Sequence, residues 1–141
     1  VNQLLYENHF EPDEQLGFTP AGNVLTRESG GVGPGTQQCL RIDCAGAIYP
    51  KLYLDDTKLT RRLCTITGYY KSPGKETSLH LACGIPHPSP NVPLILPATN
   101  DWIQFSYEVD LTEWDVTACE LRVGTRTMGT AWIDELKVLT N

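Results

Sequence analysis

Hydrophobic and polar residues alternate along much of the chain with a period of two, the repeat of a β-strand that buries one face. Such alternation predicts strands at seven places, each bounded by residues that favour turns. The predicted strands are Cys39–Cys44, Lys51–Leu54, Leu63–Lys71, Ser78–Cys83, Trp102–Asp110, Ala118–Gly124 and Thr130–Leu139. The only candidate for a helix is a short turn near Asp55–Thr60. We therefore expect helix in less than about 10% of the residues.

Segments rich in glycine and proline separate the predicted strands. The clearest are Ser29–Gly35, Ser72–Gly74 and Gly84–Pro97. Short strands without helices between them predict an all-β fold, an antiparallel β-sandwich. Because no repeat or internal linker interrupts the pattern, residues 1–141 are expected to form a single domain.

Composition and charge exclude several classes of protein. Hydrophobic residues make up 40% of the chain and charged residues 20%, which is enough to build a packed core. The formal charge of −6 argues against a nucleic-acid partner, because binding to phosphates needs a basic surface. No apolar run reaches the roughly 18 to 20 residues of a membrane helix, so no membrane partner is expected. The start at Val1 is typical of a mature product or of a module cut from a longer protein.

Five cysteines cannot all pair within the chain, because their number is odd. Cys44, Cys64, Cys83 and Cys119 alternate with aliphatic residues, so we expect them on buried faces. Most should be unpaired thiols that fill the core, with one buried disulfide as the alternative. The sequence has no C-x-x-C pair, which argues against a metal site built on cysteine.

The last predicted strand contains a carboxylate on its apolar face. In the alternation, Trp132, Asp134, Leu136 and Val138 share the face that points to the core. A buried carboxylate is costly unless an arginine, backbone amides or a cation compensates its charge. Asp134 is therefore either an ordinary hydrogen-bonded aspartate or a ligand of calcium, which prefers oxygen ligands.

Five segments in order resemble the carbohydrate-binding modules of the family 4, 9 and 22 group. The opening segment Asn2–Glu11 (NQLLYENHFE) resembles the N-L-x-x-N-x-x-F-E start of these modules. The other similar segments are Gln38–Ile42 (QCLRI), Thr65–Ser72 (TITGYYKS), Trp102–Val109 (WIQFSYEV) and Gly129–Leu139 (GTAWIDELKVL). The chain departs from the family pattern at Glu135, which replaces the second Asp of the closing motif, and at Phe18, near the usual tryptophan.

The resemblance implies a jelly-roll β-sandwich that binds a polysaccharide or oligosaccharide and does not cleave it. Such modules are usually monomeric parts of larger, secreted enzymes that degrade polysaccharides. Many contain a structural calcium ion where the first and last strands meet. By position, its ligands would be the side chains of Asp134 and Glu11 and the carbonyls of His9 and Gln38.

A sugar site needs flat aromatic faces flanked by polar side chains. Tyr69 faces away from the core in its predicted strand, at a position that is often aromatic on the binding sheet of the family. The polar residues with the same outward phase on their own strands are His80, Gln104, Arg41 and Arg122. We expect these side chains to form one polar groove on a concave sheet, with Tyr49 and Tyr53 at its rim.

The tryptophans differ in their expected roles. Trp132 has the phase of a core residue, and Trp102 begins a strand at a position that is structural in the family. Trp114 lies in a predicted loop, Leu111–Val116, and is a candidate ligand contact.

The sequence gives little support to catalysis. Its histidines have no nucleophile–base spacing, and the motifs G-x-S-x-G and H-E-x-x-H do not occur. We therefore expect a non-catalytic module. The alternatives are a jelly-roll structural or adhesion domain of a surface or phage-tail protein, and a small lyase or glycosidase on a similar sandwich.

Overall fold

The computed structural model describes residues 3–32, 37–46, 48–55, 63–82, 93–111 and 119–140. The strands are β1 (Gln3–Asn8), β2 (Val24–Ser29), β3 (Gln38–Cys44), β4 (Lys51–Tyr53), β5 (Leu63–Ser72), β6 (Thr77–Ala82), β7 (Leu94–Leu96), β8 (Thr99–Asp110), β9 (Glu120–Thr125) and β10 (Gly129–Thr140). No helix occurs in the described ranges, and so none that is long and apolar enough to cross a membrane.

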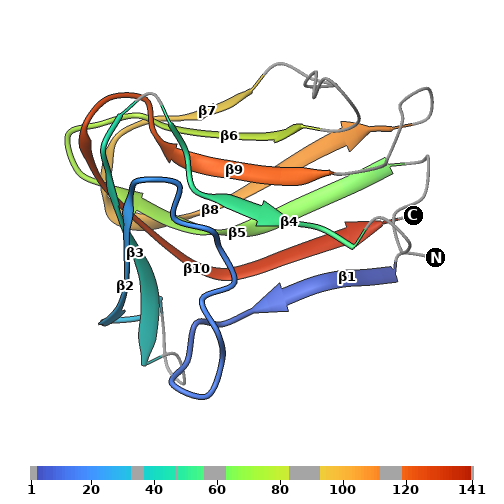
Figure 1. Ribbon diagram of the computed structural model, residues 1–141, viewed down its shortest axis with the longest axis horizontal. Helices are drawn as coiled ribbons and strands as arrows, with labels where there is room; N and C mark the ends of the chain where they lie inside the picture. The colour runs from blue at the N-terminus through green and yellow to red at the C-terminus, as the bar shows by residue number, and fades with distance from the viewer. Residues whose placement is uncertain are drawn as a thin grey trace.

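The strands form two antiparallel sheets that are layered as a sandwich (Figure 1). The six-stranded sheet has the order β2-β3-β10-β5-β8, and β1 also pairs with β10. The four-stranded sheet has the order β4-β9-β6-β7. β3 pairs with the first half of β10 and β1 with its second half, so Gln3 lies opposite Thr140. The predicted antiparallel all-β sandwich is confirmed.

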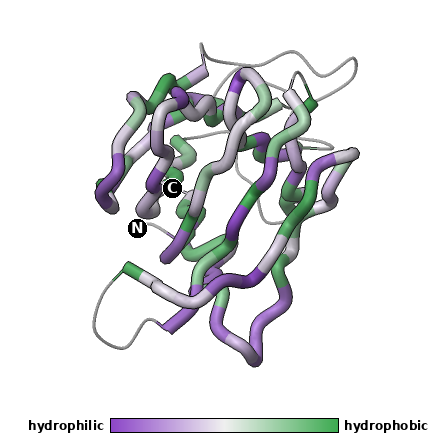
Figure 2. The backbone as a smooth tube through the Cα atoms, turned by 90° about the vertical axis from the view of Figure 1, so that its left-hand side faces the viewer, coloured by the Kyte–Doolittle hydropathy of each residue, from purple (hydrophilic) through white to green (hydrophobic). Residues whose placement is uncertain are grey.

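The core lies between the two sheets and is built from every second residue of the strands, the ones that point inward. Ile42 and Ile66 of the six-stranded sheet and Leu81 and Leu121 of the four-stranded sheet are almost completely buried. Figure 2 shows hydrophobic and hydrophilic stretches following one another along the strands. Inward or outward orientation is therefore encoded residue by residue.

The four cysteines in the described part of the chain are buried, namely Cys39, Cys44, Cys64 and Cys119. Burial raises the pKa of the Cys64 thiol to about 12. Such thiols pack as small apolar groups and do not act as nucleophiles at neutral pH. Cys83 lies outside the described residues.

Each of the seven predicted strands corresponds to a strand in the structure, with ends that differ by a few residues. The sequence pattern missed β1, β2 and β7. β2 lies at the edge of its sheet and alternates only weakly between exposed and half-buried residues. β7 is a three-residue apolar strand within the segment Gly84–Pro97, which was expected to be a break between strands.

A β-bulge in β10 corrects the predicted orientation of Trp132. Ile133 faces the core before the bulge and Leu136 faces it afterwards, because the register with β5 shifts between Asp134 and Lys137. Trp132 is therefore on the opposite face from Leu136 and not in the core, contrary to the simple alternation. The bulged residue Glu135 has a φ of 52°, an uncommon value for a residue with a side chain.

Candidate functional site

The structure divides the predicted groove between the two sheets. Tyr69, Gln104 and Arg41 lie on β5, β8 and β3 of the six-stranded sheet, whereas His80, Arg122 and Tyr53 lie on β6, β9 and β4 of the four-stranded sheet. All of them face away from the core, as predicted. Because the outer faces of a sandwich point in opposite directions, these residues cannot contact one oligosaccharide together. The expectation of a single groove is therefore wrong, and Trp114 lies outside the described residues.

On the four-stranded sheet, three basic side chains lie side by side on the outer face. Arg122 of β9 is directly opposite Lys51 of β4 on one side and His80 of β6 on the other. Arg122 lies between Leu121 and Val123, which are buried in the core, so its own side chain points outward. The alternation of β4 also placed Lys51 outward, but the sequence analysis did not select it.

Tyr49 contributes an aromatic ring to this row. Its ring centroid is 5.8 Å from that of His80, with an interplanar angle of 80°. The two rings and their neighbours Ile48, Lys51 and Arg122 line an open depression of about 330 Å³. Tyr53 is 60% exposed and is not among the lining residues. We call this depression, with its five lining residues, the basic depression.

Glu120 holds the guanidinium of Arg122 in place. Arg122 Nε donates a hydrogen bond of 2.7 Å to Glu120 Oε1, and Nη2 donates to the same oxygen. The Glu120 residue is only 3% exposed. Such a fixed guanidinium is pre-organised to donate its remaining hydrogen bonds to a ligand.

His80 is nine-tenths buried, and its Nδ1 atom has no hydrogen-bond partner among the residues that the structure describes. Burial, and then the positive charge of Arg122, lower the pKa of His80 below its usual value, although Glu120 acts in the other direction. The imidazole is therefore neutral at pH 7, with one nitrogen that can accept and one that can donate. Buried polar atoms are normally satisfied, so this shielded nitrogen is an exception, and the ring itself, which lines the basic depression, is a candidate ligand contact.

The outer face of the six-stranded sheet has a different character. Trp132 lies opposite Arg41 on one neighbouring strand and Lys71 on the other, and both cations approach its ring centroid, at 5.6 and 4.9 Å. Lys71 also lies 5.2 Å from the centroid of Trp102. Trp132 Nε1 donates a hydrogen bond to Glu28. These aromatic rings are occupied by cation–π contacts within the protein.

Tyr69 is on the same face, half-buried, with Gln104 and Asp134 opposite it on the neighbouring strands. Arg41 lies two strands away from it, bonded to Asp43 and Glu28. Tyr69 and Gln104 are thus brought together, whereas Arg41 belongs to the cluster around Trp132.

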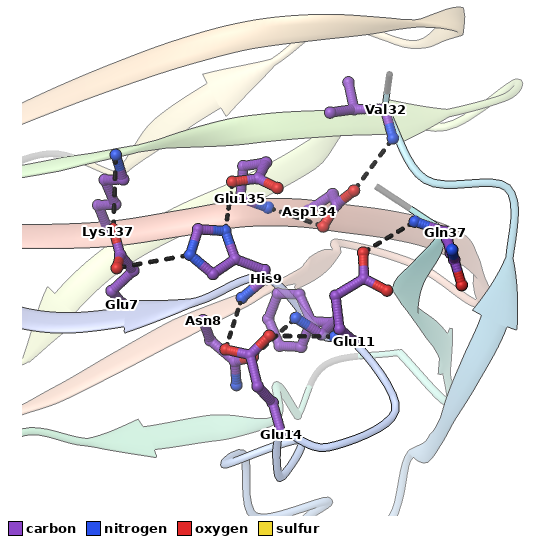
Figure 3. A network of polar contacts seen from close by, with 11 residues as sticks. Glu7, Asn8, His9, Glu11, Glu14, Val32, Gln37, Asp134, Glu135 and Lys137 are labelled. Carbon is purple, nitrogen blue, oxygen red and sulfur yellow. Dashed lines mark hydrogen bonds and ion pairs between the residues drawn. The ribbon is translucent and has the colours of Figure 1, made fainter. Parts of the chain in front are cut away.

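The predicted calcium ligand Asp134 is completely buried (Figure 3). Its carboxylate accepts hydrogen bonds from the backbone N–H of Val32 at 3.0 Å and of Glu135 at 2.9 Å. Burial raises the pKa of Asp134 to about 6, and the nearby charges of Glu135 and Glu11 act in the same direction. The backbone bonds therefore only partly compensate this buried carboxylate.

Glu11 lies close enough to Asp134 for its charge to raise the pKa of Asp134. Oε1 of Glu11 accepts a hydrogen bond of 2.8 Å from the backbone N–H of Gln37. The next residue, Gln38, has a buried Oε1 without a hydrogen-bond partner. The imidazole of His9 contacts Glu135 and Glu7 (Figure 3). The carbonyl of His9, the predicted ligand, is not part of these contacts.

No three His, Cys, Asp or Glu side chains in the described ranges could together hold a metal ion. A calcium ion beside Asp134 would therefore take part of its coordination from backbone or amide oxygens, a donor set that calcium accepts.

Comparisons with known proteins show the fold. No family model and no curated protein matches the sequence. The structure is similar to the CBM22-1 xylan-binding domain of Xyn10C from Paenibacillus barcinonensis, with a TM-score of 0.75 and 15% identity over 100% of this chain and 97% of that one. It is also similar to the C-terminal family 22 carbohydrate binding module of Xyn10B from Clostridium thermocellum, with a TM-score of 0.73 and 12% identity over 97% and 94% of the two chains.

A third similar structure is the enzymatically active domain of tailspike protein 4 from bacteriophage CBA120, with a TM-score of 0.61 and 7% identity. It covers 82% of this chain and 17% of that one. The protein thus has the jelly-roll β-sandwich fold that family 22 carbohydrate-binding modules adopt.

Proposed function

We propose that the protein is a non-catalytic carbohydrate-binding module, and that it binds a polysaccharide or oligosaccharide in the basic depression. The observation that carries this proposal is the position of His80. Its ring is nine-tenths buried, borders the depression next to Tyr49 and keeps a nitrogen without a partner. The part of the imidazole that borders the depression is available to a sugar hydroxyl, whereas Nδ1 itself is shielded from solvent.

The other lining residues fit the chemistry of a sugar. Tyr49 and Ile48 offer apolar surface to the C–H groups of a pyranose ring. Arg122 and Lys51 supply hydrogen-bond donors for hydroxyl oxygens. By fold similarity to the xylan-binding domains, xylan is the first polysaccharide to test.

The positions of the carboxylates support binding without cleavage. A glycosidase uses two carboxyl groups that face each other across the scissile bond. No carboxylate lines the basic depression among the residues that the structure describes, and nearby Glu120 is engaged by Arg122. We propose that the module is monomeric and secreted, as part of a larger enzyme that acts on polysaccharides.

The test compares two tyrosines on opposite faces. Isothermal titration with xylo-oligosaccharides should show binding by the parent protein and by Tyr69→Ala. Loss of the ring in Tyr49→Ala should weaken binding about tenfold or more, because one aromatic contact to a sugar contributes roughly 1 to 3 kcal/mol.

The opposite result, with Tyr69→Ala defective and Tyr49→Ala normal, would place the site on the six-stranded sheet. Self-association in size-exclusion chromatography without binding to any of a panel of polysaccharides would favour the structural or adhesion domain instead. Release of reducing ends from a bound polysaccharide would contradict the non-catalytic role.

We also propose one structural calcium ion between Asp134 and Glu11. The buried and incompletely compensated carboxylate of Asp134, the neighbouring charge of Glu11 and the unpartnered oxygen of Gln38 support this proposal. Phe10 and Glu135, next to these ligands, both have positive φ angles, of 55° and 52°. Such strain is often kept at binding sites. The ion would connect the segment after β1 to β10 and to the start of β3.

A further inference from the structure

We infer that the basic depression selects glycans that carry carboxylate groups, that is, polysaccharides that contain uronic acids. The inference rests on the proposed function, because it names the ligand class of the same site. It goes beyond the binding of an uncharged polysaccharide, because it assigns a role of its own to the positive charge of the depression.

The first observation is that side chains of like charge face each other across two strands. Lys51 is directly opposite Arg122 in the antiparallel pairing of β4 and β9. Like charges in this position destabilise a sheet. His80, a third basic group, is opposite Arg122 on the other side. The chain as a whole has 11 Lys and Arg against 17 Asp and Glu, so this row is a local exception to its acidic character.

The second observation is that one positive charge in the row remains uncompensated. Glu120 neutralises Arg122, to which it is bonded. The side chain of Lys51 makes no ion pair among the described residues, and no described carboxylate lines the depression. A ligand carboxylate there would contact Lys51, accept a hydrogen bond from Arg122 and leave an N–H of His80 available for bonding.

The third observation excludes a general site for polyanions. Tyr49 and Ile48 form part of the lining, so a ligand needs an apolar face as well as a charge. The net charge of −6 repels a densely charged polyanion such as a nucleic acid more strongly than a polysaccharide with widely spaced carboxylates. The volume of about 330 Å³ suits a small part of a ligand, such as a sugar ring with its substituent. A uronic acid combines the ring and the carboxylate in one unit.

The experiment uses one polysaccharide in two forms. Glucuronoxylan and the same preparation with its carboxyl groups chemically reduced to alcohols are compared by affinity electrophoresis or titration. We expect the acidic form to bind more tightly to the parent protein, and we expect the difference to shrink as salt is added. Lys51→Gln should weaken binding to the acidic form by about three- to fivefold, the range of an accessible ion pair, and weaken binding to the reduced form less, because the glutamine amide still donates a hydrogen bond to a hydroxyl.

Lys75→Gln is the matched control, because it removes the same charge from an exposed turn away from the depression. It should bind both forms as the parent does. If the parent protein shows equal affinity for the two forms under all salt conditions, this inference is overturned and the proposed function stands. The same holds if Lys51→Gln prefers the acidic form as strongly as the parent does. Failure of both forms to bind contradicts the proposed function itself. Tight binding of polyglutamate, which has carboxylates but no sugar rings, would also overturn the inference.

Discussion

The ring of Tyr49 lies against the backbone of Gly124. A Cβ atom added at Gly124 would be 3.0 Å from Cδ1 of Tyr49 and 3.2 Å from the sulfur of Cys44. Because Gly124 of β9 has no side chain, the ring of Tyr49, which precedes β4, can lie beside the basic depression. The glycine and the tyrosine form one structural unit although they are far apart in the sequence.

Gly124→Ala should consequently displace the Tyr49 ring. We expect weaker binding to xylan and a loss of about 1 to 3 kcal/mol in the free energy of unfolding, because overpacking of this size strains a tight contact. Titration calorimetry and chemical denaturation measure the two effects. A folded Gly124→Ala protein with the parent's affinity would show that the position of Tyr49 does not matter for binding.

The alternation of hydrophobic and polar residues predicts which way a side chain points but not the sheet to which it belongs. Tyr69 and His80 both face outward, as the pattern predicted, yet they lie on different sheets. Strand pairing is decided by long-range contacts that a period of two does not contain. His80 and Arg122 were expected in one groove and are indeed neighbours, whereas Lys51, which lies next to Arg122, was not selected.

The bulge in β10 shows a second limit. A single extra residue reverses the faces of a strand, and the segment Trp132–Leu139 has no glycine that would indicate the bulge. Alternation read from Leu136 backward therefore placed Trp132 in the core. Asp134 is buried, as predicted, with 0% exposure. It lies on the outer face of the sheet with Trp132, however, and not on the predicted core face, and Val32 of another segment contacts its carboxylate there.

Calcium should stabilise the protein through Asp134. The melting temperature of the parent should rise with added calcium and fall with EDTA, because an ion that binds only the folded state stabilises it by mass action. Asp134→Asn should not respond to either. Glu76→Gln, which removes a carboxylate from an exposed turn, should respond as the parent does. If all three proteins melt alike in calcium and in EDTA, there is no calcium site.

His80 makes stability depend on pH in a defined direction. Burial and the charge of Arg122 lower its pKa in the folded state below the ordinary 6.5. The contribution of the neutral imidazole is thus fully present above pH 6.5 and is lost as the pH falls through the lowered value. We expect the melting temperature to decline on acidification in this window, and less so in His80→Gln. If NMR gives His80 a pKa of 6.5 or higher in the folded protein, the burial of its ring does not have the effect described.

Trp132 should matter for stability and not for binding. Trp132→Phe keeps a ring for Arg41 and Lys71 but removes the hydrogen bond to Glu28, which is the main reason that the pKa of Glu28 is lowered. We expect a loss of about 1 kcal/mol in the free energy of unfolding, because the pair is partly exposed. The affinity for xylan should not change. A tenfold weaker affinity in the folded variant would instead assign a ligand role to this face.

The central claim is that the outer face of the four-stranded sheet binds the glycan. Titration of the ¹⁵N-labelled protein with a xylo-oligosaccharide, followed by NMR, tests it most directly, because the chemical shift of each backbone amide reports whether the ligand binds near it. The account predicts that the largest shift changes occur at Tyr49, Lys51, His80 and Arg122, with little change at Tyr69 or Trp132. Shift changes concentrated at Tyr69, Lys71 and Trp132, with none along β4 and β9, would contradict it.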